Sequence, residues 1–111
     1  MKTLLLVVLI AACSPTDSDG GSKVDDATLR VRKYAFEAFP QWAMVHANKQ
    51  CPDTVAALNE YVKATGTNDP WGHPYRMFCG ANVPDGAKTL AIASDGPDGK
   101  PNTPDDIDSW K

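Results

Sequence analysis

The last seventeen residues, 95–111, restrict the fold more than any other part of the chain. Glycine and proline occur in them so often that neither a helix nor a strand is expected to run through the segment. Five aspartates lie in the same stretch, and carboxylates that close together repel one another unless a positive charge lies between them. The segment is therefore either a solvated acidic tail, the usual case for a run of charge, or a loop that binds a hard divalent cation such as Ca²⁺.

The amino-terminal segment predicts export and a lipid anchor. A single basic residue, Lys2, precedes an unbroken apolar run from Leu4 to Ile10, which is typical of a secretory signal and too short to span a bilayer. The run ends in Ile10-Ala-Ala-Cys13, which resembles the lipobox of bacterial lipoproteins. That resemblance implies a signal peptide over residues 1–12 and a diacylglycerol on the sulfur of Cys13, whose amino group is then acylated, for example with palmitate. The alternative is an ordinary signal peptide followed by a chance cysteine.

Removal of the signal peptide leaves a short polar segment and one small domain. Residues 13–22 are expected to be the lipidated N-terminus and a flexible tether, and residues 23–111 a single domain with a modest core. Loss of Lys2 leaves ten basic and fourteen acidic residues, so the net charge is −4. Negative charge without a basic cluster argues against a nucleic-acid partner. In lipoproteins, Ser14 directly after the lipidated cysteine favours the outer membrane, with the domain facing the periplasm or the cell surface.

The two remaining cysteines, Cys51 and Cys79, are predicted to form a disulfide, because an exported chain enters an oxidising compartment. Closing the loop between them stabilises a domain of this size by about 3–4 kcal/mol in the chain-entropy model. The alternative is a pair of free thiols or a soft metal site, which neither the spacing nor a nearby histidine cluster supports.

Two helices and two strands are expected before the acidic segment. Apolar residues at intervals of three and four predict a long helix over residues 25–48, with Pro40 kinking it or ending its first half; they are Leu29, Val31, Tyr34, Ala35, Ala38, Phe39, Trp42 and Val45. Asp25 and Asp26 suit the start of that helix. A shorter helix follows Pro52, capped by Asp53 or Thr54 and ending near Gly66, with Val55, Leu58, Tyr61 and Val62 on one face. Residues 75–79 and 89–94 are strand candidates, which gives an α+β domain: a long helix packed on a small antiparallel sheet.

The chain contains no set of residues that indicates an enzyme. His46 and His73 have no metal-ligand partner at helical spacing, and no nucleophile elbow, zinc-protease or phosphate-loop motif occurs. Ser94 precedes an aspartate, but no histidine follows to act as its base. The acidic segment also lacks the alternating carboxylates and final glutamate of an EF-hand. We therefore expect no catalysis, and any calcium site here is of another kind.

Three motifs in a fixed order resemble the C-terminal domain of the type II secretion system protein G family, the major pseudopilins. They are Asp69-Pro-Trp-Gly-His-Pro-Tyr75, then Ser94-Asp-Gly-Pro-Asp-Gly99, then Thr103-Pro-Asp-Asp-Ile-Asp-Ser-Trp110. The resemblance implies a pilin-like fold and a structural calcium ion in the loop after the last strand. By position, it implies side-chain ligands from Asp98, Asp105 and Asp106, with backbone carbonyls near Asp95 and Thr103. The carboxylates of Asp95 and Asp108 are weaker candidates.

The loop must fold back to bring Asp98 to Asp105, seven residues further on, and Gly96 and Gly99 permit that turn. The chain departs from the family at its start, because a pseudopilin begins with a prepilin leader and a long apolar helix, where this chain has a lipobox. We therefore expect a lipid-anchored, calcium-stabilised interaction or structural domain in the cell envelope, accessory to secretion or pilus proteins. The alternatives are an atypical pseudopilin that assembles into the pseudopilus and, last, a free-standing envelope enzyme.

Overall fold

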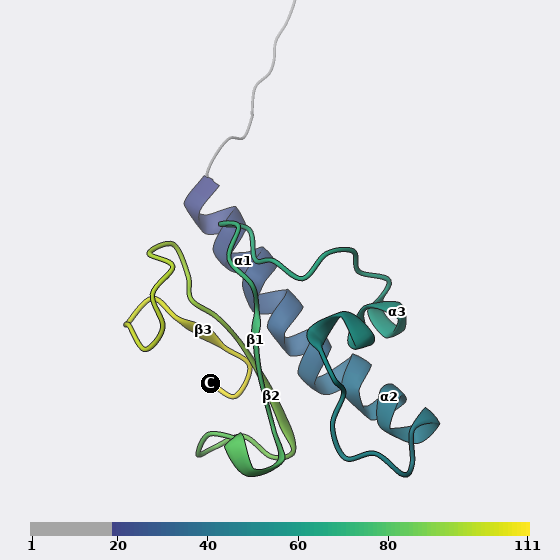
Figure 1. The fold of residues 1–111 in the computed structure, drawn as a ribbon. Coiled ribbons are helices and arrows are strands. Elements are labelled where there is room, and N and C mark those ends of the chain that lie inside the picture. The colour runs from purple at the N-terminus through teal and green to yellow at the C-terminus, as the bar shows by residue number, and fades with distance from the viewer. Residues whose placement is uncertain (1–18) are drawn as a thin grey trace, which may run out of the picture.

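A long helix lies across a three-stranded antiparallel sheet in the computed structural model, which describes residues 19–111 (Figure 1). The predicted signal peptide and the predicted lipidation site Cys13 lie outside these residues. The elements in chain order are α1 (Asp19–Lys33), the π-helical turn η1 (Tyr34–Ala38), α2 (Phe39–Val45), the 3₁₀ turn η2 (Val55–Leu58), α3 (Asn59–Val62), β1 (Arg76–Cys79), the 3₁₀ turn η3 (Gly80–Asn82), β2 (Leu90–Ser94) and β3 (Ile107–Asp108). The predicted α+β class, with a long helix on a small antiparallel sheet, is confirmed.

The long helix begins earlier and ends earlier than its apolar pattern predicts. It starts at Asp19, so residues 19–22 of the expected tether are helical, and Asp25 and Asp26 lie inside the helix rather than at its start. It ends at Val45, where the backbone N–H of His46 donates to the carbonyl of Trp42 at 2.9 Å. Within residues 19–111, no helix combines the length and the apolar composition that crossing a bilayer requires.

Pro40 does not end the helix, so that part of the sequence-based prediction is wrong. Proline has no backbone N–H to donate within a helical ladder. Directly before it, η1 widens the helix by one residue, and the N–H of Phe39 donates to the carbonyl of Tyr34, five residues back. Pro40 then falls at the start of α2, where its missing N–H is tolerated. A local change of helix type therefore carries the chain through the proline.

The helix packs its buried face against both η2 and the sheet. The core contains Val31, Tyr34, Ala35, Ala38, Trp42, Val55, Leu58, Tyr75, Leu90 and Ile92. Three members of the predicted apolar stripe are not in it: Leu29 is 55% exposed, Val45 is 67% exposed, and Phe39 is partly buried and packs against the core from outside. The extra residue of η1 rotates everything after it by about 100° relative to a regular helix. This rotation turns Val45 away from the face that carries Val31 and Ala38, which accounts for its loss from the predicted stripe.

The short second helix is a 3₁₀ turn, η2, followed by the single turn α3. Thr54 precedes it in extended conformation without a side-chain cap, and Lys63, in the left-handed region with φ 55°, ends it. Gly66 is therefore not the terminator, although the side-chain amide of Asn59 donates to its carbonyl at 2.9 Å. Asn59 also accepts a hydrogen bond from the hydroxyl of Tyr34 at 2.5 Å, which ties this turn to the long helix.

The sheet has the order β1-β2-β3, with the fully buried β2 at its centre. β1 and β2 confirm the two predicted strands, and their register pairs Arg76 with Ala93 and Cys79 with Leu90. β3 was not expected, because it lies in the segment rich in glycine and proline. It is only two residues long and pairs Ser94 with Ile107. The predicted disulfide is present at the end of β1, where it joins Cys79 to Cys51 with their Cα atoms 6.0 Å apart.

Candidate metal centre

The acidic loop, residues 95–106, leaves the sheet at the end of β2 and returns to the same place as β3. Ser94, the last residue of β2, pairs with Ile107, the first residue of β3. The loop therefore starts and finishes beside the same pair of strands, at the opposite end of the sheet from the β1–β2 connection (Figure 1). Its two ends are held by backbone pairing, which leaves the residues between them to define a site.

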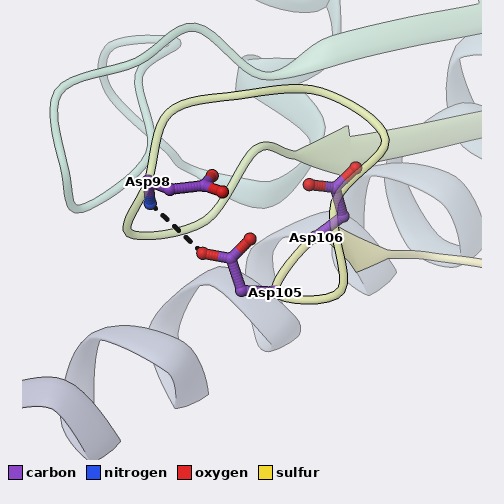
Figure 2. A group of neighbouring side chains, drawn as sticks. All are labelled: Asp98, Asp105 and Asp106. Carbon is purple, nitrogen blue, oxygen red and sulfur yellow. Dashed lines mark hydrogen bonds between the residues drawn. The ribbon is translucent and has the colours of Figure 1, made fainter.

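Three carboxylates of this loop converge on one small space. Asp98, Asp105 and Asp106 each offer an oxygen atom, and these atoms all lie within 4.8 Å of one another. Figure 2 shows the three side chains pointing inward from both arms of the loop. Calcium binds oxygen at 2.3–2.6 Å, so two ligands on opposite sides of one ion are about 5 Å apart. The spacing of these oxygens therefore fits a single calcium ion, and the side chains that the sequence predicted as ligands are brought together.

Glycine allows the loop to fold back on itself. Gly96 has φ +75°, and a Cβ atom at this position would clash with the carbonyl of Asp105. The N–H of Asp98 donates to Asp105 Oδ2 at 3.2 Å, which closes the loop across seven residues (Figure 2). Gly99, with φ +67°, lies so close to the His73 imidazole that a Cβ atom would come within 2.5 Å of its Nε2. The predicted reversal at Gly96 and Gly99 is present.

Hydrogen bonds hold the three carboxylates in place. Backbone N–H groups donate to Asp98 from Lys100 at 2.9 Å and to Asp106 from Asn102 at 2.6 Å. The hydroxyl of Thr103 lies 2.5 Å from Asp105 Oδ1, 3.0 Å from Asp106 Oδ1 and 3.1 Å from the Lys100 carbonyl, and it has one proton to donate among these acceptors. The bond from Thr103 lowers the pKa of Asp105 below its usual value. The Asp105 carboxylate is therefore charged at neutral pH, as a calcium ligand must be.

The other predicted site residues have different partners. The carboxylate of the buried residue Asp95 accepts a hydrogen bond from Arg76 Nε at 2.6 Å. The same guanidinium reaches Asp106, with Nη2 3.5 Å from Oδ2. Asp108 forms an ion pair with Lys111 at 2.8 Å and does not belong to the cluster. The carbonyl of Thr103 accepts a hydrogen bond from the N–H of Asp106 at 3.1 Å, which leaves one of its lone pairs free.

A buried carboxylate supports the loop from outside, and the sequence analysis gave it no role. Asp69 is 4% exposed; its Oδ1 accepts from the N–H groups of Trp71 and His73, and its Oδ2 accepts from the Ser94 hydroxyl at 2.6 Å. The Ser94 hydroxyl accepts in turn from the N–H of Gly96 at 3.1 Å. The sequence did contain a signal for this role, because an aspartate at the start of a turn commonly accepts a hydrogen bond from the backbone N–H two residues later. Asp69 thus connects the turn of residues 68–74 to the first turn of the acidic loop.

A model of the family described as type II secretion system (T2SS), protein G matches residues 21–110. No curated protein and no solved structure gives a match to this chain. The matched range takes in the long helix, the sheet and the whole acidic loop, so the resemblance first indicated by three motifs extends over the described domain. Pseudopilins of this family are structural components of a secretion system, which agrees with the expectation that the chain is not an enzyme. The chain belongs to the type II secretion system protein G family of pseudopilins.

Proposed function

We propose that the protein is a calcium-stabilised structural domain of the type II secretion machinery in the cell envelope, held at the membrane by a lipid on Cys13. The observation that carries the calcium part is the convergence of Asp98, Asp105 and Asp106 to within 4.8 Å in a family-matched domain. Two of the three side chains are partly buried and all three accept backbone or hydroxyl hydrogen bonds, so their positions are fixed before any ion binds. A hard cation with a preference for oxygen suits that donor set.

The role proposed for the ion is structural. A bound calcium ion supplies positive charge that offsets the repulsion between three carboxylates. Asp98 lies on the outgoing arm of the loop, and Asp105 and Asp106 lie on the returning arm, directly before β3. One ion shared by both arms therefore fixes the segment that leads into the third strand. Backbone carbonyls near Asp95 and Thr103 complete the proposed coordination shell.

Thermal unfolding of the purified full-length protein with excess Ca²⁺ and with EGTA tests the metal. Calcium at a hundred times its Kd is expected to stabilise the protein by about 2.7 kcal/mol, which raises Tm by several degrees. Asp98→Asn should remove most of that gain, because it takes one charge from the ligand set. The matched control is Asp85→Asn, an exposed aspartate in the β1–β2 connection. A Tm of the wild-type protein that is the same in Ca²⁺ and in EGTA would contradict the proposal.

The lipid anchor rests on the Ile10-Ala-Ala-Cys13 sequence. Acylation at both the sulfur and the amino group of Cys13 gives a stable membrane attachment, since a single chain binds only marginally. The partners proposed on this basis are the membrane, with the outer membrane favoured by Ser14, and proteins of the secretion machinery. Radiolabelled palmitate should enter the wild-type protein and not the Cys13→Ser variant, which should also leave the membrane fraction. Equal labelling of both proteins contradicts the anchor.

A second candidate is an atypical pseudopilin that assembles into the pseudopilus itself. The observation that favours it is the family match, which covers the long helix as well as the sheet and the loop. This function requires processing by prepilin peptidase and recovery of the protein in sheared filaments. Palmitate labelling that depends on Cys13 decides against it, whereas peptidase-dependent processing together with filament recovery decides for it.

A further inference from the structure

Arg76 brings a positive charge from the sheet into the proposed calcium site. We propose that this guanidinium competes with the divalent cation for Asp106, and that it thereby lowers the affinity of the site while holding the loop together when no cation is bound. The inference rests on the calcium site proposed above and concerns how that site is regulated.

The contacts of Arg76 join two different parts of the acidic loop. Its Nε lies 2.6 Å from Asp95 Oδ1, and its Nη2 lies 3.5 Å from Asp106 Oδ2. The side chains of Asp95 and Asp106 are only 13% and 7% exposed, so solvent screens these pairs weakly. Among the ion pairs of residues 19–111, these two are the ones that reach the acidic loop, and both use Arg76. The guanidinium therefore occupies the place of an internal counter-ion for the loop.

The direction of the guanidinium is fixed by aromatic packing. Arg76 and Phe78 are two residues apart on β1, so their side chains share one face of the sheet. The guanidinium carbon lies 5.4 Å from the centroid of the Phe78 ring, a cation–π distance. Phe78 in turn packs edge-to-face on Trp110, with centroids 6.1 Å apart. Arg76 is thus held toward Asp95 and Asp106 and is not free to move far into solvent.

Arg76 has two opposing effects on calcium binding: it orders the loop through Asp95, and it competes with the cation at Asp106. The contacts indicate which effect is larger. The shorter contact goes to Asp95, whose carboxylate is outside the three-residue cluster, so the ordering that it supplies acts mainly on the fold of the loop. The longer contact goes to Asp106, which belongs to the cluster, and there the guanidinium would share one carboxylate with a bound divalent cation. Like charges that close repel strongly at low exposure. Competition at Asp106 is therefore the larger effect on affinity.

The test is calcium titration of the full-length protein by calorimetry, combined with thermal unfolding in EGTA. Arg76→Gln removes the charge and keeps a donor for Asp95, and it should raise calcium affinity roughly tenfold, as loss of a nearby like charge predicts. Arg76→Met should act in the same direction but with a lower Tm in EGTA, because Asp95 loses its partner. Arg76→Lys keeps the charge and should bind calcium about as well as the wild type. Lys88→Gln removes one charge at the other end of β2 and should leave the affinity unchanged.

The outcomes separate this inference from the function on which it rests. Tighter binding by Arg76→Gln, with Arg76→Lys and Lys88→Gln near wild type, supports it. If the wild type binds calcium and Arg76→Gln binds it equally well or more weakly, the role of Arg76 is overturned and the calcium site is still supported. No binding by the wild type overturns both. If Arg76→Met does not fold in EGTA, Arg76→Gln still decides, because its amide keeps the hydrogen bond to Asp95.

Discussion

The two ends of β1 are attached to the rest of the domain by different chemistry. At one end, Cys79 is bonded covalently to Cys51, which ties the strand to the segment after the long helix. At the other end, Arg76 holds Asp95 and Asp106 of the acidic loop through ion pairs. A four-residue strand in a small domain needs help at both ends, because so short a sheet buries little surface by itself.

The two attachments differ in how they respond to pH and to dissolved ions. A disulfide is unaffected by cations and by moderate changes of pH, and only a reductant breaks it. The acidic loop depends on charge, so protons, cations and salt all act on it. We therefore expect the domain to have one fixed end and one end whose stability follows the ionic conditions of the envelope.

The largest expected effect is loss of the covalent end. The double variant Cys51→Ser/Cys79→Ser should be less stable than the oxidised wild type, with a free energy of unfolding lower by about 3–4 kcal/mol. The reason is that the bridge closes a loop with sequence separation 28. Urea denaturation of both proteins measures this. The loss should be the same in Ca²⁺ and in EGTA. A loss that depends on calcium would show that the two ends are not independent.

Loss of the buried Asp69 carboxylate should rank second. Asp69→Ala leaves two backbone N–H groups and the Ser94 hydroxyl without an acceptor, at a cost of about 2–3 kcal/mol in the free energy of unfolding. Because Ser94 leads into the acidic loop, proteolysis at the loop should also become faster. Asp53→Ala is the matched control: its ion pair with Lys49 is exposed, and its loss should change stability by less than about 0.5 kcal/mol. Equal losses of stability in the two variants would contradict a stabilising role for the hydrogen bonds of Asp69.

A pair of glycines tests how tightly the loop is folded. Gly96 and Gly66 have nearly the same φ, +75° and +73°, so alanine at either costs about 1 kcal/mol from backbone strain. Only Gly96 has a neighbour in the way, the carbonyl of Asp105, whereas nothing lies within 4 Å of a Cβ at Gly66. Gly96→Ala should therefore cost about 1 kcal/mol more than Gly66→Ala. Denaturation in EGTA compares them, and equal losses would mean that the loop opens freely.

The smallest expected effect is a shift in acid titration. The hydrogen bond from Thr103 lowers the folded-state pKa of Asp105 below the unfolded value of 3.8. A lowered pKa stabilises the fold above the unfolded pKa, and this contribution disappears as the pH falls through the lower folded value. Titration of the Asp105 carboxyl by NMR in EGTA should show the low pKa, and Thr103→Val should raise it. An unchanged pKa in Thr103→Val would exclude the hydroxyl as the cause.

Patterns that depend on nearby residues made most of the fold predictable. The two longer strands, the disulfide, and the cluster of Asp98, Asp105 and Asp106 all follow from local composition, from the compartment or from family motifs. Three features did not follow. β3 forms because backbone pairing with Ser94 overrides the poor strand propensity of its surroundings. The pairing of Arg76 with Asp95 and Asp106 joins positions far apart in sequence, and only the sheet register places them together.

The third unpredicted feature is the π-helical turn, and it has a consequence for how relatives of this chain should be aligned. Its bond from the N–H of Phe39 to the carbonyl of Tyr34 spans five residues instead of four, so one position in this stretch has no counterpart in a regular helical ladder. A relative without proline at position 40 can complete a regular helical ladder and has no need of that insertion. We therefore expect alignments with relatives that lack Pro40 to show a one-residue gap within positions 34–38.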